Sequence, residues 1–459
     1  MSRFCISICV ISVALIVGFL SSLPPHTHWI PANSLPPKYV WTAGFSLLST
    51  VDSVLRALTP PNLYMFKELM GYLHTVEIYS AAELRVADAI ASYTEIYFPR
   101  GGSSHSAGVP IRALGLAIAP GCEIAPPNSP GDCMAVSRRL SRLLRALSAY
   151  GVFRELPAGS DSWVNTPSST FLLEAHPYSL RPAALNFGRT QYTMMERLPE
   201  SIVTGDAAFK QVHGGEFWGW YKEHPVEHAI FDGTMNALGK LGAADLAIAR
   251  DFLWGQEADT VVDVGGGTGE MAAEVLRSCP VPPKRAIIFD MPDVIKRSQE
   301  AWSGNESRAG SAHLQNLLKE HPNLSFRVSH APGDMFSHTT IPIPSTASTR
   351  YAYMLRDILH DWADEECVKI LRSLRTAIKG SPQSSVAVVA RMIVPGAGFI
   401  KSLGSTDADI VMMGAFGTTA GERTKEQYEE LFKEAGLALH SVTPTRSQYF
   451  ILLAKVANQ

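Results

Sequence analysis

The chain has 459 residues, of which 40 are Lys or Arg and 43 are Asp or Glu, so its formal net charge at neutral pH is −3. Hydrophobic residues make up 46% of the chain and charged residues 18%, which is ordinary for a globular protein of two or three domains. No segment carries the clustered Lys and Arg that phosphate contacts require, so nucleic acid is not an expected partner. The six cysteines lack the spacing of a disulfide framework, which indicates a reducing compartment.

The N-terminal segment, residues 1–30, contains an almost uninterrupted apolar run from Phe4 to Leu23. Arg3 precedes the run, Pro24 follows it, and the run is long enough to span a bilayer. The first interpretation is a membrane anchor in the endoplasmic reticulum, with the catalytic part facing the cytosol. A cleaved signal peptide and a mis-assigned start codon are the alternatives, and the protein would be cytoplasmic if the segment were not retained.

A helical domain is predicted for residues 40–230. Apolar residues recur at helical spacing in Phe45–Leu58 and in Leu63–Ile90, and we expect helices in both. Residues 99–132 are rich in Gly, Ser and Pro and show little periodicity. That composition predicts an exposed, flexible insertion within the domain.

The next segment of this domain has a second pattern. Ala135–Tyr150 predicts an amphipathic helix, and two short β-type segments at residues 152–155 and 163–165 follow it as a hairpin. A helix followed by a hairpin is typical of a winged helix.

A glycine-rich loop then follows a short apolar strand, Thr260–Val264, and precedes a helical pattern, Glu270–Arg277. Such a loop lies where open α/β sheets bind ligands. The spacing does not fit the dinucleotide fingerprint and favours S-adenosylmethionine over NAD. The alternative is a tight turn without a ligand. The acid and glycines that define the loop are Asp263, Gly265, Gly267 and Gly269.

Polar groups also follow three later predicted strands. Asp290 follows the strand Arg285–Phe289, where an acid accepts hydrogen bonds from a ribose. A strand at Leu324–Val328 leads to Gly333-Asp334-Met335-Phe336, a carboxylate beside apolar side chains suited to an adenine, although Asp334 alone could be a turn residue. The last strand, Tyr351–Leu355, leads into residues 356–362.

These segments together resemble the class I O-methyltransferases of the caffeate and fungal secondary-metabolite type, over residues 140–459. The resemblance implies a Rossmann-like α/β methyltransferase domain at residues 235–459, preceded by an all-helical, winged-helix-like domain that forms a homodimer. The motifs that carry it are Val261–Glu270, Phe289-Asp290-Met291-Pro292, Gly333-Asp334-Met335-Phe336, Leu359-His360-Asp361-Trp362 with Asp364–Cys367, and Gly421-Glu422-Arg423-Thr424.

The loop and the resemblance together assign three groups of residues. S-adenosyl-L-methionine is expected to contact Asp263, Gly265, Gly267, Asp290, Asp334, Met335 and Arg356. The substrate, a phenolic or polyketide hydroxyl compound, is expected to contact Met235, Asn236, Trp362, Asp409 and Met412. Aromatic residues between 207 and 235 suit a flat ligand, with interdomain core as the alternative for most of them. The catalytic residues are expected to be His360, Glu422 and Arg391.

His360 is expected to be the general base. An imidazole with an ordinary pKa near 6.5 can accept the hydroxyl proton as the oxygen attacks the sulfonium methyl group. The sulfonium already activates that methyl group, so no metal is expected. Taken without its context, the residue could equally be an ordinary surface or core histidine.

Arg391 is where the chain departs from the resembling family, whose members usually carry a glutamate there to orient the histidine. The orienting role would then fall to Glu422. If Arg391 faces His360, its charge should lower the pKa of the base, and replacing it with Glu should raise methyl transfer. Two alternatives are pairing of Arg391 with an acid such as Asp409 and gripping of an anionic substrate.

The departure at Arg391 also motivates rival functions. One is a related cyclase or dehydratase that keeps the S-adenosylmethionine pocket but transfers no methyl group. The other is a catalytically silent partner subunit.

Overall fold

The structure, a computed structural model, describes residues 35, 37–97, 108–119, 132–240, 243–303, 312–395 and 405–457. It divides into two compact units, one containing residues 46–189 and the other residues 190–457. The predicted anchor, Phe4–Leu23, lies outside the described residues. Within the described part of the chain, no helix has both the length and the apolar character needed to cross a bilayer.

The first unit is mostly helical. The predicted helix and hairpin are present as α7, β2 and β3, and β1 adds to them to form an antiparallel sheet of order β1-β3-β2. Its elements, with α2 leading into it, are α2 (Lys38–Leu58), α3 (Pro61–Leu69), α4 (Gly71–Glu83), α5 (Val86–Tyr97), β1 (Val109–Pro110), α6 (Ile111–Ile118), α7 (Cys133–Ala149), β2 (Phe153–Glu155), β3 (Ser162–Asn165) and α8 (Arg181–Gly188).

The helical prediction for Leu63–Ile90 is confirmed, and the segment is divided among α3, α4 and α5. The chain turns between α4 and α5 at Arg85, whose φ of 53° is left-handed and whose guanidinium pairs with Glu174. One expectation for this unit needs correction. Residues 108–119, inside the expected flexible insertion, form β1 and α6 and bury Leu114 in the core. Residues 99–107 and 120–131 of that insertion lie outside the described residues.

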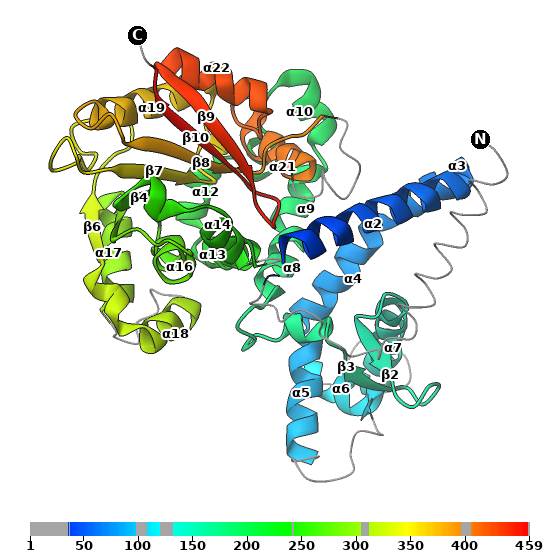
Figure 1. The fold of residues 1–459 in the computed structure, drawn as a ribbon. Coiled ribbons are helices and arrows are strands. Elements are labelled where there is room, and N and C mark those ends of the chain that lie inside the picture. The colour runs from blue at the N-terminus through cyan, green and yellow to red at the C-terminus, as the bar shows by residue number, and fades with distance from the viewer. Residues whose placement is uncertain are drawn as a thin grey trace. The chain divides into compact units, whose positions relative to one another are not determined.

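The second unit is built on a seven-stranded sheet of order β6-β5-β4-β7-β8-β10-β9 (Figure 1). The first five strands in that order are parallel, and β10 runs antiparallel to both neighbours. The Rossmann-like α/β class is confirmed. The strands are β4 (Thr260–Val264), β5 (Arg285–Asp290), β6 (Val328–Pro332), β7 (Tyr351–Arg356), β8 (Ser385–Ala390), β9 (Leu437–Pro444) and β10 (Phe450–Val456).

One strand differs from its predicted position. The expected strand Leu324–Val328 is mostly a 3₁₀ helix, Pro322–Phe326, and β6 begins only at Val328. Pro322 explains the difference, because its fixed φ favours the first turn of a helix and it offers no N–H to a strand ladder.

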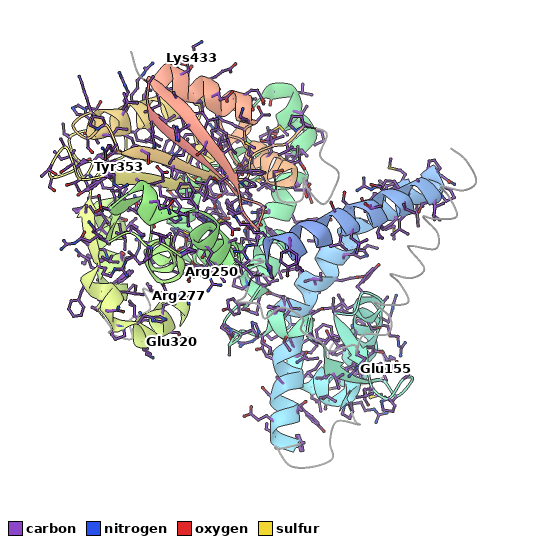
Figure 2. The ribbon with its side chains drawn as sticks, viewed as in Figure 1. Glu155, Arg250, Arg277, Glu320, Tyr353 and Lys433 are labelled. Atoms are coloured by element: carbon purple, nitrogen blue, oxygen red, sulfur yellow. The ribbon has the colours of Figure 1, made fainter. Side chains whose placement is uncertain are left out.

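Helices cover both faces of this sheet, so its central strands are buried on both sides. All five residues of β4 are buried; Val262 packs with α19 and α22 on one face and Val261 with α14 and α16 on the other. Figure 2 shows the buried Tyr353 within the sheet, while Lys433 lies on the outer surface of α22. The helices after β4 are α16 (Glu270–Ser278), α17 (Pro292–Trp302), α18 (Ala312–Glu320), α19 (Asp364–Ile378), α21 (Thr406–Phe416) and α22 (Lys425–Ala435).

The helices between residue 190 and β4 also belong to the second unit. The two compact units divide between Arg189 and Thr190. These helices are α9 (Thr190–Met195), α10 (Leu198–Thr204), α11 (Ala208–His213), α12 (Phe217–Glu223), α13 (Pro225–Lys240), α14 (Ala244–Asp251) and α15 (Trp254–Glu257).

Candidate active site

Several predicted site residues lie at the carboxyl ends of neighbouring parallel strands. Val264 at the end of β4 is in register with Phe289 of β5 and Leu355 of β7. The residues that follow those three positions are Gly265, Asp290 and Arg356. The sheet therefore brings them to one edge, where α/β sheets bind ligands.

The glycine loop depends on left-handed backbone at Gly265, Gly267 and Gly269, whose φ angles are 69°, 55° and 86°. A Cβ added to Gly265 would lie 2.4 Å from Cδ1 of Ile358. Ile358 stands two residues before His360, so the loop and the segment that carries His360 pack directly against each other.

Asp290 holds this loop through its carboxylate. Its Oδ2 accepts a hydrogen bond from the amide N–H of Gly267 at 2.9 Å, and its Oδ1 accepts one from Met291 at 2.7 Å. Burial raises the pKa of Asp290, and the two amide donors oppose that rise.

Asp263 and Arg356 form a buried charged group beside the loop. Burial raises the pKa of Asp263 to about 7, while the nearby Arg356 guanidinium acts to lower it. Oδ2 of Asp263 has no hydrogen-bond partner among the described residues. Nη1 of Arg356 lies 2.6 Å from Oδ1 of Asp245.

The predicted adenine-side residues lie on the loop after β6. Oδ1 of Asp334 accepts a hydrogen bond from the N–H of Phe336 at 2.9 Å, so this acid does stabilise a turn. Met335 is half-buried, and the Phe336 ring meets Trp362 edge-on with centroids 4.8 Å apart. Trp362 thus stands beside this loop.

His360 lies in a 3₁₀ helix, Leu359–Asp361, directly after the loop that ends β7. Its Nδ1 is 2.8 Å from Oε1 of Glu422, and both side chains are buried. Its Nε2 lies 3.5 Å from Oδ1 of Asp361. Because an ionised carboxylate only accepts hydrogen bonds, Glu422 places a proton on Nδ1.

The carboxylates around His360 move its pKa away from the value that the sequence predicted. Burial alone would lower the pKa of His360, but the carboxylates of Asp361, Glu422 and Asp357 outweigh it and raise the pKa to about 9. The ordinary pKa near 6.5 that was expected for this base therefore does not hold in the free protein. Burial in turn raises the pKa of Asp361 to about 6.

Arg391 lies beside Glu422, 14% exposed, and not against Asp409. Its Nη1 is 3.7 Å from Oε1 of Glu422, and its Nη2 is 3.6 Å from Oδ2 of Asp357. Nη2 also donates a hydrogen bond to the hydroxyl of Tyr449 at 2.7 Å. The positive charge of Arg391 therefore partly offsets the negative charges of Glu422 and Asp357, two of the acids that surround His360.

The loop that carries Glu422 is fixed from two sides. Oδ1 of Asp409 accepts a hydrogen bond from the N–H of Glu422 at 2.9 Å. Arg423 donates to the backbone oxygens of Leu359 and Trp362, both at 2.8 Å. Asp409, predicted to line the substrate pocket, therefore positions the Glu422 loop.

The remaining predicted substrate residues lie apart from these contacts. Met235 and Asn236 are exposed on α13, and Met412 is half-buried on α21. The roles of these three residues in substrate binding stay predictions.

Sequence reasoning missed four residues of this site. Arg423 was part of a recognised motif but had no assigned role, and Asp357 lies in the segment 356–362, where only Arg356, His360 and Trp362 were given roles. Asp245 and Tyr449 gave no signal, because their contacts with Arg356 and Asp357 join residues more than 90 positions apart in the sequence.

One histidine pair has a spacing compatible with metal binding, four residues apart at the start of α13. His224 stacks on Trp220 with ring centroids 3.9 Å apart, and His228 lies 3.7 Å from Asp232. Over the described ranges, no three His, Cys, Asp or Glu side chains are grouped to hold a metal ion.

Comparisons with known proteins agree on one family. The family model for the O-methyltransferase domain matches residues 195–438. The 3-amino-4-hydroxybenzoate 4-O-methyltransferase of Streptomyces cremeus is 30% identical over 377 residues, which cover 82% of this chain and 85% of the relative. The phenazine O-methyltransferase PhzM of Lysobacter antibioticus is 28% identical over 403 residues, covering 86% and 96%.

Solved structures give the same result. The crystal structure of LaPhzM superposes with a TM-score of 0.66 and 25% identity, covering 87% of this chain and all of that one. The glycine loop, the strand-end residues and the buried His360–Glu422 pair all lie in the second unit, which contains most of the matched region. The chain therefore belongs to the O-methyltransferase family and is an S-adenosylmethionine-dependent O-methyltransferase.

Proposed function

We propose that this O-methyltransferase methylates a phenolic or enolic hydroxyl of a small aromatic or polyketide metabolite, with His360 as the general base. The observation that carries the proposal is the buried pair of His360 Nδ1 and Glu422 Oε1 at 2.8 Å. Such a pair orients an imidazole and selects its tautomer.

Glu422 decides which nitrogen of His360 acts. With the proton of the neutral ring held on Nδ1 by the carboxylate, the lone pair is on Nε2, and Nε2 is the atom that receives the hydroxyl proton. Glu422 then stabilises the imidazolium that results, as an ionised partner does in other acid–base pairs.

The raised pKa of His360 sets a condition on this role. At neutral pH most of the free protein holds a protonated ring, which cannot accept another proton. His360 must first release that proton, and a base of higher pKa then accepts the substrate proton more strongly.

The residues at the strand ends fit S-adenosylmethionine. A Cβ at Gly267 would meet nothing within 4 Å, so the loop leaves space for a ligand there. Asp290 offers carboxylate oxygens to ribose hydroxyls, and the unpartnered Oδ2 of Asp263 offers a buried acceptor for a donor or cation. When bound, the cofactor supplies a methyl group already activated by its sulfonium. Met335 and Arg356 complete the proposed contacts, with Asp334 at the exposed rim.

Aromatic side chains near α21 support a flat substrate. Phe217 meets Phe231 edge-on and Phe416 at a tilt, and Trp218, 48% exposed, packs edge-on against Phe217 and Phe231. The buried members of this cluster are core. Trp218 and Trp362 remain available to a ligand, and the relatives named above act on phenazine and hydroxybenzoate compounds according to their names.

A homodimer is proposed from the exposed apolar surface of the first unit. No residue of α3 is buried, and Leu63, Phe66 and Leu69 are each more than half exposed. Such a surface marks a protein interface. We also retain the proposal that Phe4–Leu23 anchors the chain to a membrane, to be tested by cell fractionation with and without residues 1–30.

The test of the reaction is transfer of a labelled methyl group. Purified full-length protein is incubated with S-adenosylmethionine labelled at the methyl group and a panel of phenols and enols. We expect labelled ether product and an equal amount of S-adenosylhomocysteine. Saturable cofactor binding with no S-adenosylhomocysteine from any substrate that binds would reject methyl transfer, and a rearranged product would point to the cyclase alternative.

A further inference from the structure

Tyr449 is a fully buried residue immediately before β10, and no role has been assigned to it. Its backbone oxygen accepts a hydrogen bond from the N–H of Thr445 at 3.1 Å. The adjacent Arg446 pairs with the buried Asp251, with Nη2 2.7 Å from Oδ1. The turn between β9 and β10 is thus fixed, and Tyr449 is held in place with it.

The hydroxyl of Tyr449 bridges two oppositely charged side chains. It donates a hydrogen bond to Oδ2 of Asp357 at 2.7 Å and accepts one from Nη2 of Arg391, also at 2.7 Å. Arg391 lies over the Tyr449 ring at 5.0 Å from the centroid, and Arg356 lies at 5.2 Å. One neutral side chain therefore contacts both arginines of the site.

Asp357 is also held in an uncommon backbone conformation. Its φ of 51° is left-handed, which non-glycine residues adopt only when their surroundings compensate the cost. Two guanidinium groups face its carboxylate, Arg391 at 3.6 Å and Arg356 at 3.7 Å, and the Tyr449 hydroxyl completes the set.

These contacts determine where the Arg391 cation lies. Direct pairing with Asp357 alone would draw the guanidinium away from Glu422. Nη2 of Arg391 donates its hydrogen bond to the Tyr449 hydroxyl. Nη1 of Arg391 lies 3.7 Å from Oε1 of Glu422, the oxygen that also bonds to His360. The position of Arg391 between the two acids therefore depends on a neutral acceptor at this point.

We propose that Tyr449 is a positioning residue for proton transfer: its hydroxyl holds Arg391 against Glu422 and thereby fixes the orientation and proton affinity of His360. The proposal rests on the proposed function only in taking His360 as the base. The charged and titratable groups that face His360 are Asp361 on its own 3₁₀ helix, Asp357 after β7, Glu422 with Arg391 behind it, and Tyr428 of α22, which lines the same small space.

The experiment replaces the hydroxyl alone, with Tyr449→Phe in the full chain. Histidines are ¹³C-labelled, the His360 signal is assigned by its loss in His360→Gln, and its titration is followed by NMR without substrate. Phe keeps the ring and the net charge, so a role limited to packing leaves the titration unchanged. We expect the released Arg391 to move toward Asp357, leaving Glu422 less opposed and raising the pKa of His360 by about half a unit to one unit.

Turnover gives a second readout. At pH 7 kcat/KM should fall by about three- to tenfold, because the neutral fraction of the base falls by that factor, and the acid limb of the pH profile should move to higher pH. The dissociation constant of S-adenosylmethionine should change by less than about twofold. The matched control is Tyr351→Phe on β7, for which the His360 titration should stay as in the natural protein.

Arg391→Met supplies an independent test. It removes the cation itself, so the pKa of His360 should rise by more than in Tyr449→Phe, and the double variant should titrate like Arg391→Met alone because Tyr449 acts through Arg391. An unchanged His360 titration in Tyr449→Phe, or an additive double variant, overturns the proposal. If Tyr449→Phe does not fold, Arg391→Met still tests the proposal. An unchanged His360 titration in Arg391→Met would show that Arg391 does not act on His360 and would overturn the proposal. The titration needs no turnover, so absence of methyl transfer would reject the proposed function and leave this inference to be judged separately.

Discussion

Glu422 Oε1 lies 2.8 Å from His360 Nδ1 while both side chains are buried, so the imidazole has one orientation, and its neutral form carries its proton on Nδ1. Arg391 reaches the same oxygen at 3.7 Å. Oε1 of Glu422 therefore interacts with both side chains. Its negative charge stabilises the protonated form of His360, and the Arg391 guanidinium partly offsets that charge.

Replacing His360 with Ala should reduce turnover by about two to four orders of magnitude, the loss expected when a general base is removed. S-adenosylmethionine should still bind within about twofold, because His360 is not among the proposed cofactor contacts. Isothermal titration measures the binding and the labelled-methyl assay measures the rate. His440→Ala, at an exposed position on β9, is the matched control. Turnover within threefold of the natural protein would remove His360 from the mechanism.

The pH profile follows from the raised pKa of His360. The neutral ring is the active base, and below a pKa of about 9 its fraction falls tenfold for each pH unit. kcat/KM should therefore rise with pH through the neutral range and level off near pH 9. Glu422→Gln removes one negative charge near His360, which should lower the pKa of His360 and move the acid limb of the kcat/KM profile to lower pH. The substitution also weakens the orientation of the imidazole. A limb in Glu422→Gln that stays in place or moves upward would contradict this electrostatic account.

Replacing Arg391 with Glu reverses an expectation drawn from sequence. A carboxylate at this position was expected to raise methyl transfer if Arg391 faced His360, but the structure already places Asp357, Asp361 and Glu422 around His360. A fourth buried acid leaves their charges unopposed, which should lower the melting temperature and reduce turnover at pH 7 by more than tenfold. Arg391→Lys, which keeps the charge, should retain more of both. Thermal melting and the labelled-methyl assay measure the two effects, and a gain of activity in Arg391→Glu would restore the sequence-based expectation.

The sequence predicted those parts of the site that are local in the chain. Thr260–Val264 and its glycine loop could be placed because a buried strand and left-handed glycines each have a distinct pattern. The surroundings of Arg391 could not be predicted, because its partner Tyr449 lies 58 residues away and reaches it only through the β8–β10 pairing. The strand before Gly333 was predicted at Leu324–Val328, too early in the chain. The apolar residues of that segment do not show whether Pro322 starts a helical turn.

Asp290 should be needed for cofactor binding. Asp290→Asn keeps an oxygen that can accept from Gly267 but loses the charge and one of two acceptors, so the loop and the proposed ribose contact cannot both be satisfied. We expect the dissociation constant of S-adenosylmethionine to rise by about ten- to a hundredfold with little change in the His360 titration. Asp293→Asn, an exposed acid at the start of α17, is the control. Equal affinities in the two variants would exclude Asp290 as a ligand contact.

The exposed apolar face of α3 should form the subunit interface. Phe66 is 58% exposed, and replacing it with Asp would place a charge where a second copy of the chain is expected to pack. Sedimentation velocity should then show a monomer, whereas we expect a dimer for the natural protein. Asn62→Asp adds the same charge to an exposed polar position of the same helix and should leave the dimer intact. A natural protein that sediments as a monomer, or a Phe66→Asp variant that remains dimeric, would assign this surface to another partner.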